Sequence, residues 1–211
     1  MPNINKDFIE LLNKIQKTKE ADIQQYFEEV AEYLFNHMAI KAGDKEFTFA
    51  EIEFYFYKEN EFEGPLYNCT YPRTRNAGQF FWHYSGLDIC FESKEEKRYF
   101  GGILIRSLMK DGEIIAGPMR CSDEIMNSCE ECMPFLIDYE THVGKPKSAI
   151  RYGIDADKND NESNIEFCYY IPGIEWTRPR GKVLVADKTT GGYKEKSKTD
   201  YYSAQPDKRN N

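Results

Sequence analysis

The stretch that most constrains the fold of this chain is EIEFYFY, residues 51–57. Side chains along a β-strand point alternately to opposite faces of a sheet, so a strand over this stretch has one apolar and one polar face. The apolar face belongs in the core, and the polar face is either a solvated surface or the floor of a cleft. The apolar set is Ile52, Phe54 and Phe56, and the polar set is Glu51, Glu53, Tyr55 and Tyr57.

The rest of the chain predicts helices first and strands afterwards. Two helices are expected, over residues 5–18 and 21–40, because apolar residues recur there at spacings of three and four. A third is expected over residues 122–133, with Ser122 as its N-cap. The apolar positions of the first two helices are Phe8, Leu11, Leu12 and Ile15, followed by Ile23, Phe27, Val30, Leu34 and Met38. Further strands are expected in the aromatic and β-branched runs at residues 79–86, 87–92, 101–109, 150–155 and 165–173.

Composition indicates a soluble globular protein. Charged residues make up 30% of the 211-residue chain, and no apolar run approaches the ~20 residues that a membrane-spanning helix needs. The first residues lack the basic patch and apolar run of a secretory signal, so we expect a cytoplasmic location and no membrane contact. The six cysteines are few and scattered, which favours reduced thiols over a disulfide framework and leaves single disulfides open.

The charge is unevenly distributed. The net charge is -8, yet residues 171–211 hold nine Lys or Arg against five Asp or Glu. An acidic chain opposes the non-specific attraction to phosphate that drives most nucleic-acid binding. The polar, basic end of the chain is expected to be a loop and a loosely held terminus.

Two short motifs have the spacing of metal sites but lack ligands. Cys129 and Cys132 form one C-x-x-C pair, whereas a tetrahedral zinc site needs four ligands. Residues 155–166 place oxygen ligands as in a calcium loop, but Asp160 stands where that loop needs glycine, and a polar hairpin turn explains the stretch better. We therefore expect no metal and no cofactor.

Five motifs, in order and spacing, resemble the landmarks of the alkyladenine (3-methyladenine) DNA glycosylase family. They are EIEFY, PRTRN, FFWHYSGLDICF, ILIRSL and GPMRC, and later RYGI and EWTRPR resemble two further family segments. The resemblance covers residues 47–180. It implies an enzyme that flips a damaged purine out of duplex DNA and cleaves its N-glycosidic bond without a metal, as in base-excision DNA repair.

The resemblance also implies roles for individual residues. Glu53 matches the general base that activates water, and Arg106 matches the arginine that positions this carboxylate. Tyr55 and Phe81 match aromatic residues that stack on the flipped base, and Tyr84 matches the tyrosine that is wedged into the duplex. Tyr67 falls near the family's stacking histidine, Glu92 falls where the family has a base-contacting asparagine, and His83 lies within the same aromatic segment. Basic candidates for DNA contact are Arg73, Arg75, Arg178, Arg180 and Lys182.

Elementary chemistry is compatible with this assignment. Hydrolysis of an N-glycosidic bond needs a carboxylate to take a proton from water, and flat rings to hold the base while it leaves. A Glu two residues from a Tyr on one strand supplies both groups. For Arg106 the alternative is an ordinary ion pair with Glu53 or Glu51.

We therefore predict an α/β (α+β) fold in which N-terminal helices pack on a curved, mainly antiparallel sheet. A single domain is expected, with N-terminal helices in residues 1–45, a sheet-based core in 46–186 and a polar basic tail in 187–211. The leading function is that of a monomeric DNA N-glycosylase with double-stranded DNA as its partner. Two alternatives stay open: a nucleoside N-glycosidase or nucleoside-binding protein that acts on a small molecule, and an interaction protein without enzymatic activity.

Overall fold

The computed structural model describes residues 5–94, 96, 98–129, 132–149, 151 and 166–173, together with the backbone of two strands at 182–187 and 192–197. The chain divides into two compact units, Met1–Pro172 and Gly173–Asn211. Helices and a large sheet make up the first unit. In the second unit, strands β10 (Lys182–Asp187) and β11 (Gly192–Ser197) pair antiparallel. Strand β11 differs from the expected loop.

The N-terminal helices are α1 (Lys6–Asn13) and α2 (Ile23–His37), joined by the short 3-10 segments η1 (Lys14–Lys17) and η2 (Glu20–Asp22). Helix α1 begins where it does because the side-chain oxygen of Asn5 accepts hydrogen bonds from the backbone N–H groups of Asp7 and Phe8, at 2.9 and 3.3 Å. Every apolar position predicted for the two helices is buried.

The second helix ends three residues earlier than predicted. Residues Met38–Ala42 form strand β1 instead, because they pair on one side with β2 and on the other with β7. Strand pairing therefore overrides a helical pattern that continues to Met38.

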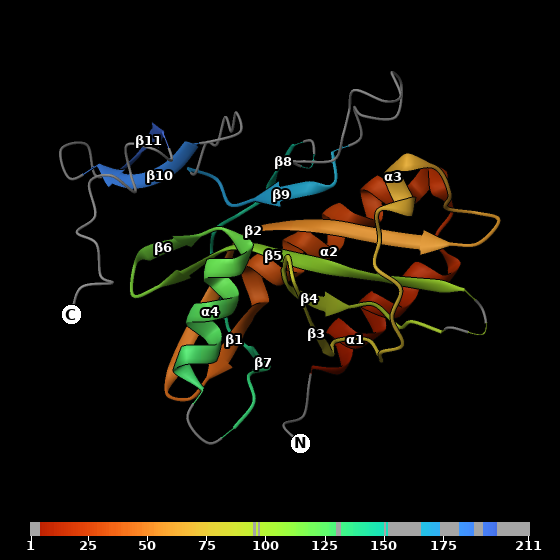
Figure 1. Ribbon diagram of the computed structural model, residues 1–211, viewed down its shortest axis with the longest axis horizontal. Helices are drawn as coiled ribbons and strands as arrows, with labels where there is room; N and C mark the ends of the chain where they lie inside the picture. Colours follow the sequence, from red (N-terminus) through yellow and green to blue (C-terminus); the bar gives the residue numbers. More distant parts are fainter. Residues whose placement is uncertain are drawn as a thin grey trace. The chain divides into compact units, whose positions relative to one another are not determined.

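All the strand pairs of the sheet are antiparallel among the described residues, and the sheet curls around the N-terminal helices (Figure 1). Its main order is β3-β4-β5-β2-β1-β7; β6 pairs with β5, and β9 pairs with both β2 and β8. The predicted α+β class with a curved, mainly antiparallel sheet is confirmed. The strands not yet bounded are β2 (Lys45–Lys58), β3 (Phe80–His83), β4 (Gly86–Cys90), β5 (Tyr99–Lys110), β6 (Glu113–Ala116), β7 (Phe135–Asp138), β8 (Lys147–Ala149) and β9 (Cys168–Tyr170).

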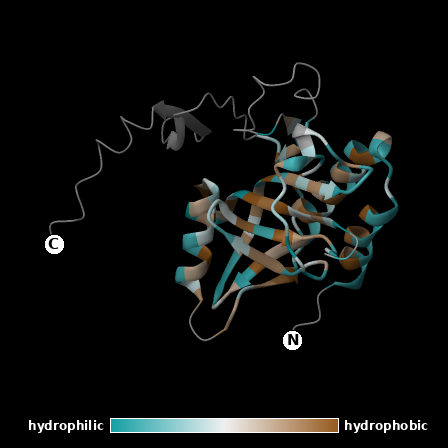
Figure 2. Cartoon of the chain, turned by 45° about the vertical axis from the view of Figure 1, so that its right-hand side comes forward, coloured by the Kyte–Doolittle hydropathy of each residue, from teal (hydrophilic) through white to brown (hydrophobic). Residues whose placement is uncertain are grey.

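The apolar face of β2 packs on α2, as the alternation predicts. The rings of Phe27 and Phe54 stack with their centroids 4.3 Å apart, and Phe167 meets Phe27 edge-on at 4.9 Å. Ile52, Phe54 and Phe56 are at most 1% exposed. Figure 2 shows hydrophobic and hydrophilic residues alternating along the strands. The core of the first unit thus lies between the N-terminal helices and one face of the sheet.

Two further helices complete the first unit, α3 (Pro65–Asn68) and α4 (Pro118–Ser128). Helix α4 begins four residues before the predicted N-cap, because Pro118 occupies its first turn, where the missing N–H costs nothing. Ser122 is buried inside the helix. A side chain on Gly86 would collide with Pro118 and Leu104, so the start of α4 lies directly on the sheet face opposite α2.

Within the described residues, no helix combines the length and the apolar character needed to cross a bilayer. All six cysteines lie in this part of the chain, and none of them forms a disulfide.

Candidate functional site

One row of residues crosses five neighbouring strands on the polar face of the sheet. In order it is Phe81, Asp88, Leu104, Glu53 and Cys168, each directly opposite the next. Directly opposed residues of antiparallel strands share a face. Since strands lie ~4.8 Å apart, the backbones of Glu53 and Asp88 are about 10 Å apart. The predicted base and the predicted stacking residue Phe81 therefore share one face of the sheet.

Within this row, Glu53 is completely buried. The Tyr55 hydroxyl donates a hydrogen bond to Oε2 of Glu53 at 2.9 Å, and Nη1 of Arg106 donates to the same oxygen at 3.4 Å. The structure thus brings together the three residues to which the family resemblance gives the base, positioning and stacking roles. It also shows the ion pair that was the alternative for Arg106.

Glu51 lies next to this group and is 3% exposed. Its Oε2 accepts a hydrogen bond from the Ser107 hydroxyl at 2.9 Å, and its Oε1 accepts one from the Cys168 thiol at 3.6 Å and lies 3.8 Å from Nε of Arg106. Of the two interpretations of the polar face, the solvated surface is therefore wrong for Glu51 and Glu53. Both carboxylates are buried because segments distant in the sequence cover this face.

Arg106 joins the two carboxylates. Burial alone would lower the pKa of Arg106, but the attraction of Glu53, and then of Glu51, outweighs it and raises the pKa above its usual value. A guanidinium that stays charged between two buried carboxylates compensates the cost of removing them from water.

Tyr55 lies between Glu53 and a second buried arginine. The guanidinium carbon of Arg151 sits 4.6 Å from the centre of the Tyr55 ring, and Nη1 of Arg151 donates to the Phe54 carbonyl at 2.8 Å. Burial, and then the negative charge of Glu53, raise the pKa of Tyr55 well above its usual value. The phenol therefore stays protonated and donates a hydrogen bond to Glu53. Nearby, burial raises the pKa of the Cys69 thiol, which Arg151 opposes.

A second buried charge group lies on the same face, around Asp88. Nη1 of Arg73 donates a hydrogen bond to Oδ2 of Asp88, and Nε2 of His83 lies 3.1 Å from Oδ1. The Arg73 guanidinium also covers the Phe81 ring, at 4.4 Å from its centre. The Ser85 N–H donates to Nδ1 of His83 at 3.3 Å, so Nδ1 is the acceptor nitrogen of the ring. The other nitrogen, Nε2, is then the one that donates a hydrogen bond to Asp88.

The remaining described candidates lie around these two groups. Tyr84 is 79% exposed, and its hydroxyl is hydrogen-bonded to that of Tyr71. Tyr67 is buried, with its ring against Phe62 and Phe167, on the side of the aromatic core.

Two further candidates have structural contacts of their own. Glu92 accepts a hydrogen bond from the Ala77 N–H at 3.2 Å and pairs with Lys94, and these contacts join it to neither Glu53 nor Phe81. Arg75 is exposed and lies 5.4 Å from the Phe81 ring centre. Arg178, Arg180 and the side chain of Lys182 lie outside the described residues, as does the hairpin turn expected at residues 155–166.

Three buried charged residues were not among the predicted site residues. Asp88 stands in the aromatic segment and Glu51 on the same face of β2 as Glu53, so alternation signals both. Arg151 had only a weak signal, the single arginine of the RYGI segment. No periodicity places it over Tyr55, because it reaches that ring from a distant segment.

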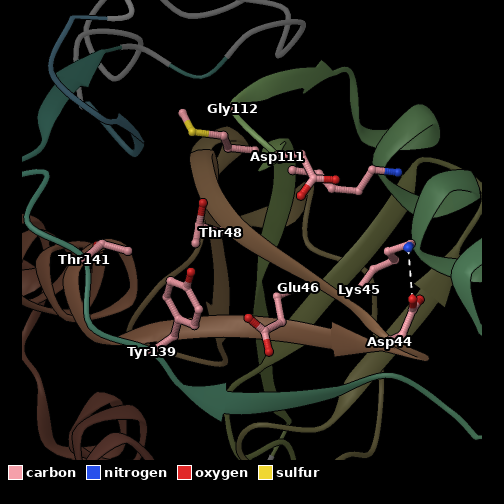
Figure 3. A pocket seen from close by; sticks show the side chains of 10 residues that line it. Asp44, Lys45, Glu46, Thr48, Asp111, Gly112, Tyr139 and Thr141 are labelled. Carbon is pink, nitrogen blue, oxygen red and sulfur yellow. Dashed lines mark hydrogen bonds and ion pairs between the residues drawn. The ribbon is translucent and has the colours of Figure 1, made fainter.

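A separate polar cavity of about 560 Å³ lies at the β1–β2 and β5–β6 turns (Figure 3). Its wall carries both signs of charge, and Lys45 pairs with Asp44 there at 3.0 Å. None of the predicted site residues lines it. Its labelled lining residues are Asp44, Lys45, Glu46, Thr48, Asp111, Gly112, Tyr139 and Thr141. The described residues contain no cluster of His, Cys, Asp or Glu that is suited to hold a metal ion.

Comparison with known proteins identifies a relative but no function. No family model matches the chain. A protein of Acanthamoeba polyphaga mimivirus, named "Uncharacterized protein L759", is 31% identical to this chain over 131 residues. The match covers 51% of this chain and 59% of that protein, whose name states no activity.

Proposed function

We propose that this protein hydrolyses the N-glycosidic bond between a base and a sugar, with Glu53 as the general base. In this reaction a water oxygen bonds to C1′, its proton passes to the carboxylate, and the base leaves with the electrons of the broken C1′–N bond. The observation that supports the proposal is the Glu53 carboxylate held by Tyr55 and Arg106 on the face that also carries Phe81. Tyr55 and Phe81 are the rings to which we assign stacking on the base, and Arg106 is the positioning residue.

The burial of Glu53 sets a requirement for this chemistry. Its carboxylate has no exposed surface, so water reaches it only when a neighbouring group moves. We expect Tyr55 to be that group, because its hydroxyl covers Oε2. A base that stacks on the Tyr55 ring displaces this hydroxyl and admits one water molecule.

The charge distribution favours a small substrate over duplex DNA. Duplex-binding proteins usually present an exposed basic face, whereas this chain has a net charge of -8. Arg73, one of the predicted DNA contacts, is only 7% exposed and is paired with Asp88, so it does not belong to an exposed basic face that a duplex could lie against. A free nucleoside or nucleotide is therefore our preferred substrate, and a damaged purine in duplex DNA, which the family resemblance implies, is the alternative.

A nucleoside-binding protein without hydrolytic activity is the second candidate function. The observation that favours it is the same burial of Glu53, because both described partners of Oε2 close the carboxylate against water. Binding without base release would then be the measured outcome.

The test measures free base by chromatography after incubation with purine nucleoside 5′-monophosphates and, separately, with methylated duplex DNA. We expect release from at least one substrate and a loss of about 100-fold or more in Glu53→Gln, since a general base contributes at least that factor. The control is Glu113→Gln, which removes an exposed carboxylate on β6 and leaves release unchanged. Equal release by the parent and Glu53→Gln, or no release from either substrate, contradicts hydrolysis.

A further inference from the structure

A second cavity lies on the polar face of the sheet, next to the Asp88 group. Its volume is about 480 Å³, in the range of small-molecule sites. Phe100 in its wall is opposite Tyr57 and four residues along β5 from Leu104, which corresponds to ~13 Å along the strand. The cavity is lined by Pro72, Arg73, Thr74, Arg98 and Phe100.

Arg73 connects this cavity to the candidate site. Its Nε donates to the Tyr71 carbonyl at 2.9 Å, and its Nη1 is bound to Asp88. Nη2 makes no hydrogen bond to any residue that the structure describes, although the side chain is 99% buried. Arg73 is one of the residues that line the cavity, and the two N–H groups of Nη2 are the donors of this guanidinium that its described partners leave unused.

Gly102 is what allows Arg73 to lie so close to the sheet. A Cβ at position 102 would sit 2.6 Å from Nη1 of Arg73 and 3.0 Å from the Asp88 side chain. Real Cβ atoms do not approach other atoms so closely, and both neighbours are buried. The absence of a side chain at this point of β5 therefore fixes the guanidinium over the strand.

Arg98 supplies a second and more accessible cation. Its side chain is 62% exposed, and its Nε lies 3.3 Å from the Glu59 carboxylate. An exposed ion pair of this kind contributes little free energy, so an anionic ligand competes for Arg98 easily. Phe100 adds an aromatic wall, with its ring stacked on Tyr57 at 5.0 Å.

We propose that this cavity binds the phosphate monoester of a small nucleotide, with Arg73 and Arg98 as the phosphate ligands. The choice of a nucleotide rests on the proposed function; the choice of phosphate rests on the cavity itself. A phosphate monoester carries a charge near −2 and three acceptor oxygens, which suits two guanidinium groups and the Thr74 hydroxyl. This cavity lies on the same face of the sheet as Glu53, and Phe100 in its wall is ~13 Å along β5 from Leu104, the residue opposite Glu53.

The test is calorimetric titration of the whole protein with adenosine 5′-monophosphate, adenosine and inorganic phosphate. We expect the monophosphate to bind at least tenfold more tightly than adenosine, and inorganic phosphate to compete with it. Arg98→Gln lowers the affinity for the monophosphate about tenfold and leaves that for adenosine unchanged, because a charged hydrogen bond is lost. The control is Arg120→Gln, which removes an equal, exposed charge on α4 and has no effect on either affinity.

Equal affinities for adenosine and its monophosphate overturn the proposal, as do equal effects of Arg98→Gln and Arg120→Gln. The proposal is also overturned if Arg98→Gln weakens binding of duplex DNA but not of the monophosphate, because Arg98 would then contact the phosphates of a DNA strand. The titration is repeated in Glu53→Gln, where base release is blocked. If the parent protein releases no base but binds adenosine 5′-monophosphate with an affinity that depends on Arg98, the phosphate site is supported and the proposed hydrolysis is contradicted.

Discussion

At the scale of single residues, the most unusual feature is the charge buried on the polar face. Glu51 and Glu53 are almost without exposed surface, and Arg106 reaches both, at 3.8 and 3.4 Å. Burying an ion pair costs desolvation free energy that the pair itself barely recovers, so hydrophobic residues would give similar stability. The retention of charge at this place is consistent with a role in binding or catalysis.

Removal of Arg106 alone is expected to destabilise the protein strongly. Arg106→Met leaves two buried carboxylates without this partner, which costs about 3–5 kcal/mol of unfolding free energy. Urea unfolding followed by circular dichroism measures the loss. Lys14→Met is the control, because Lys14 and Glu29 pair at 3.0 Å with both side chains more than half exposed, and such a pair contributes under about 1 kcal/mol. Similar losses in the two variants would show that burial adds nothing to the Arg106 ion pairs.

At the scale of elements, the close approach of Arg73 to β5 is open to a direct test. Gly102→Ala places a methyl group 2.6 Å from Nη1 of Arg73, so we expect a loss of about 1–3 kcal/mol in stability. Displacement of the guanidinium should also weaken binding of adenosine 5′-monophosphate.

The control for this variant is Gly112→Ala. Gly112 has φ +79° and no atom within 4 Å of an added Cβ, so its replacement introduces backbone strain without a collision. We expect a stability loss there with unchanged nucleotide binding. Weakened binding in both variants would mean that global destabilisation, rather than the position of Arg73, accounts for the effect.

The elements that the sequence predicts well are those with a strong local pattern. The apolar stripes of α1 and α2 and the alternation along β2 follow from spacing alone, and the structure confirms the burial of these residues. Strand β1 could not be predicted in this way, because Met38–Ala42 becomes a strand only through pairing with β2 and β7. The start of α4 carried a local signal, Pro118, that the prediction did not use.

The sequence predicts which candidate residues lie close together where they share a strand, but not where distant segments meet. Glu53 and Tyr55 are two residues apart on β2, so alternation places them together. Arg151 donates to the carbonyl of Phe54 across 97 residues, and no periodic pattern encodes such a contact. For the same reason, local pattern could not reveal that the polar face is covered and its carboxylates are buried.

At the scale of the whole first unit, burial of titratable groups makes the folded state less stable at alkaline pH. Burial raises the pKa of Cys90 from 9.0 to about 11 and that of Cys121 from 9.0 to about 12. Burial likewise raises the pKa values of Tyr26 and Tyr55 well above 10.0. All four groups are neutral when protonated, so the folded state keeps protons that the unfolded chain releases.

We therefore expect the unfolding free energy to fall as pH rises from 9 to 11. The stabilisation from each raised pKa is fully present below the unfolded value and is lost as pH approaches the folded one, at up to about 1.4 kcal/mol per pH unit for each thiol. Urea unfolding at fixed pH steps, under reducing conditions, measures this slope. Cys90→Ala combined with Cys121→Ala should reduce it most between pH 9 and 10, where the thiols of the unfolded chain ionise to a greater extent than its tyrosines. Cys132→Ala, which removes an exposed thiol, should leave it unchanged. A double variant with the parent's slope in this interval would show that neither buried thiol opposes ionisation in the folded protein.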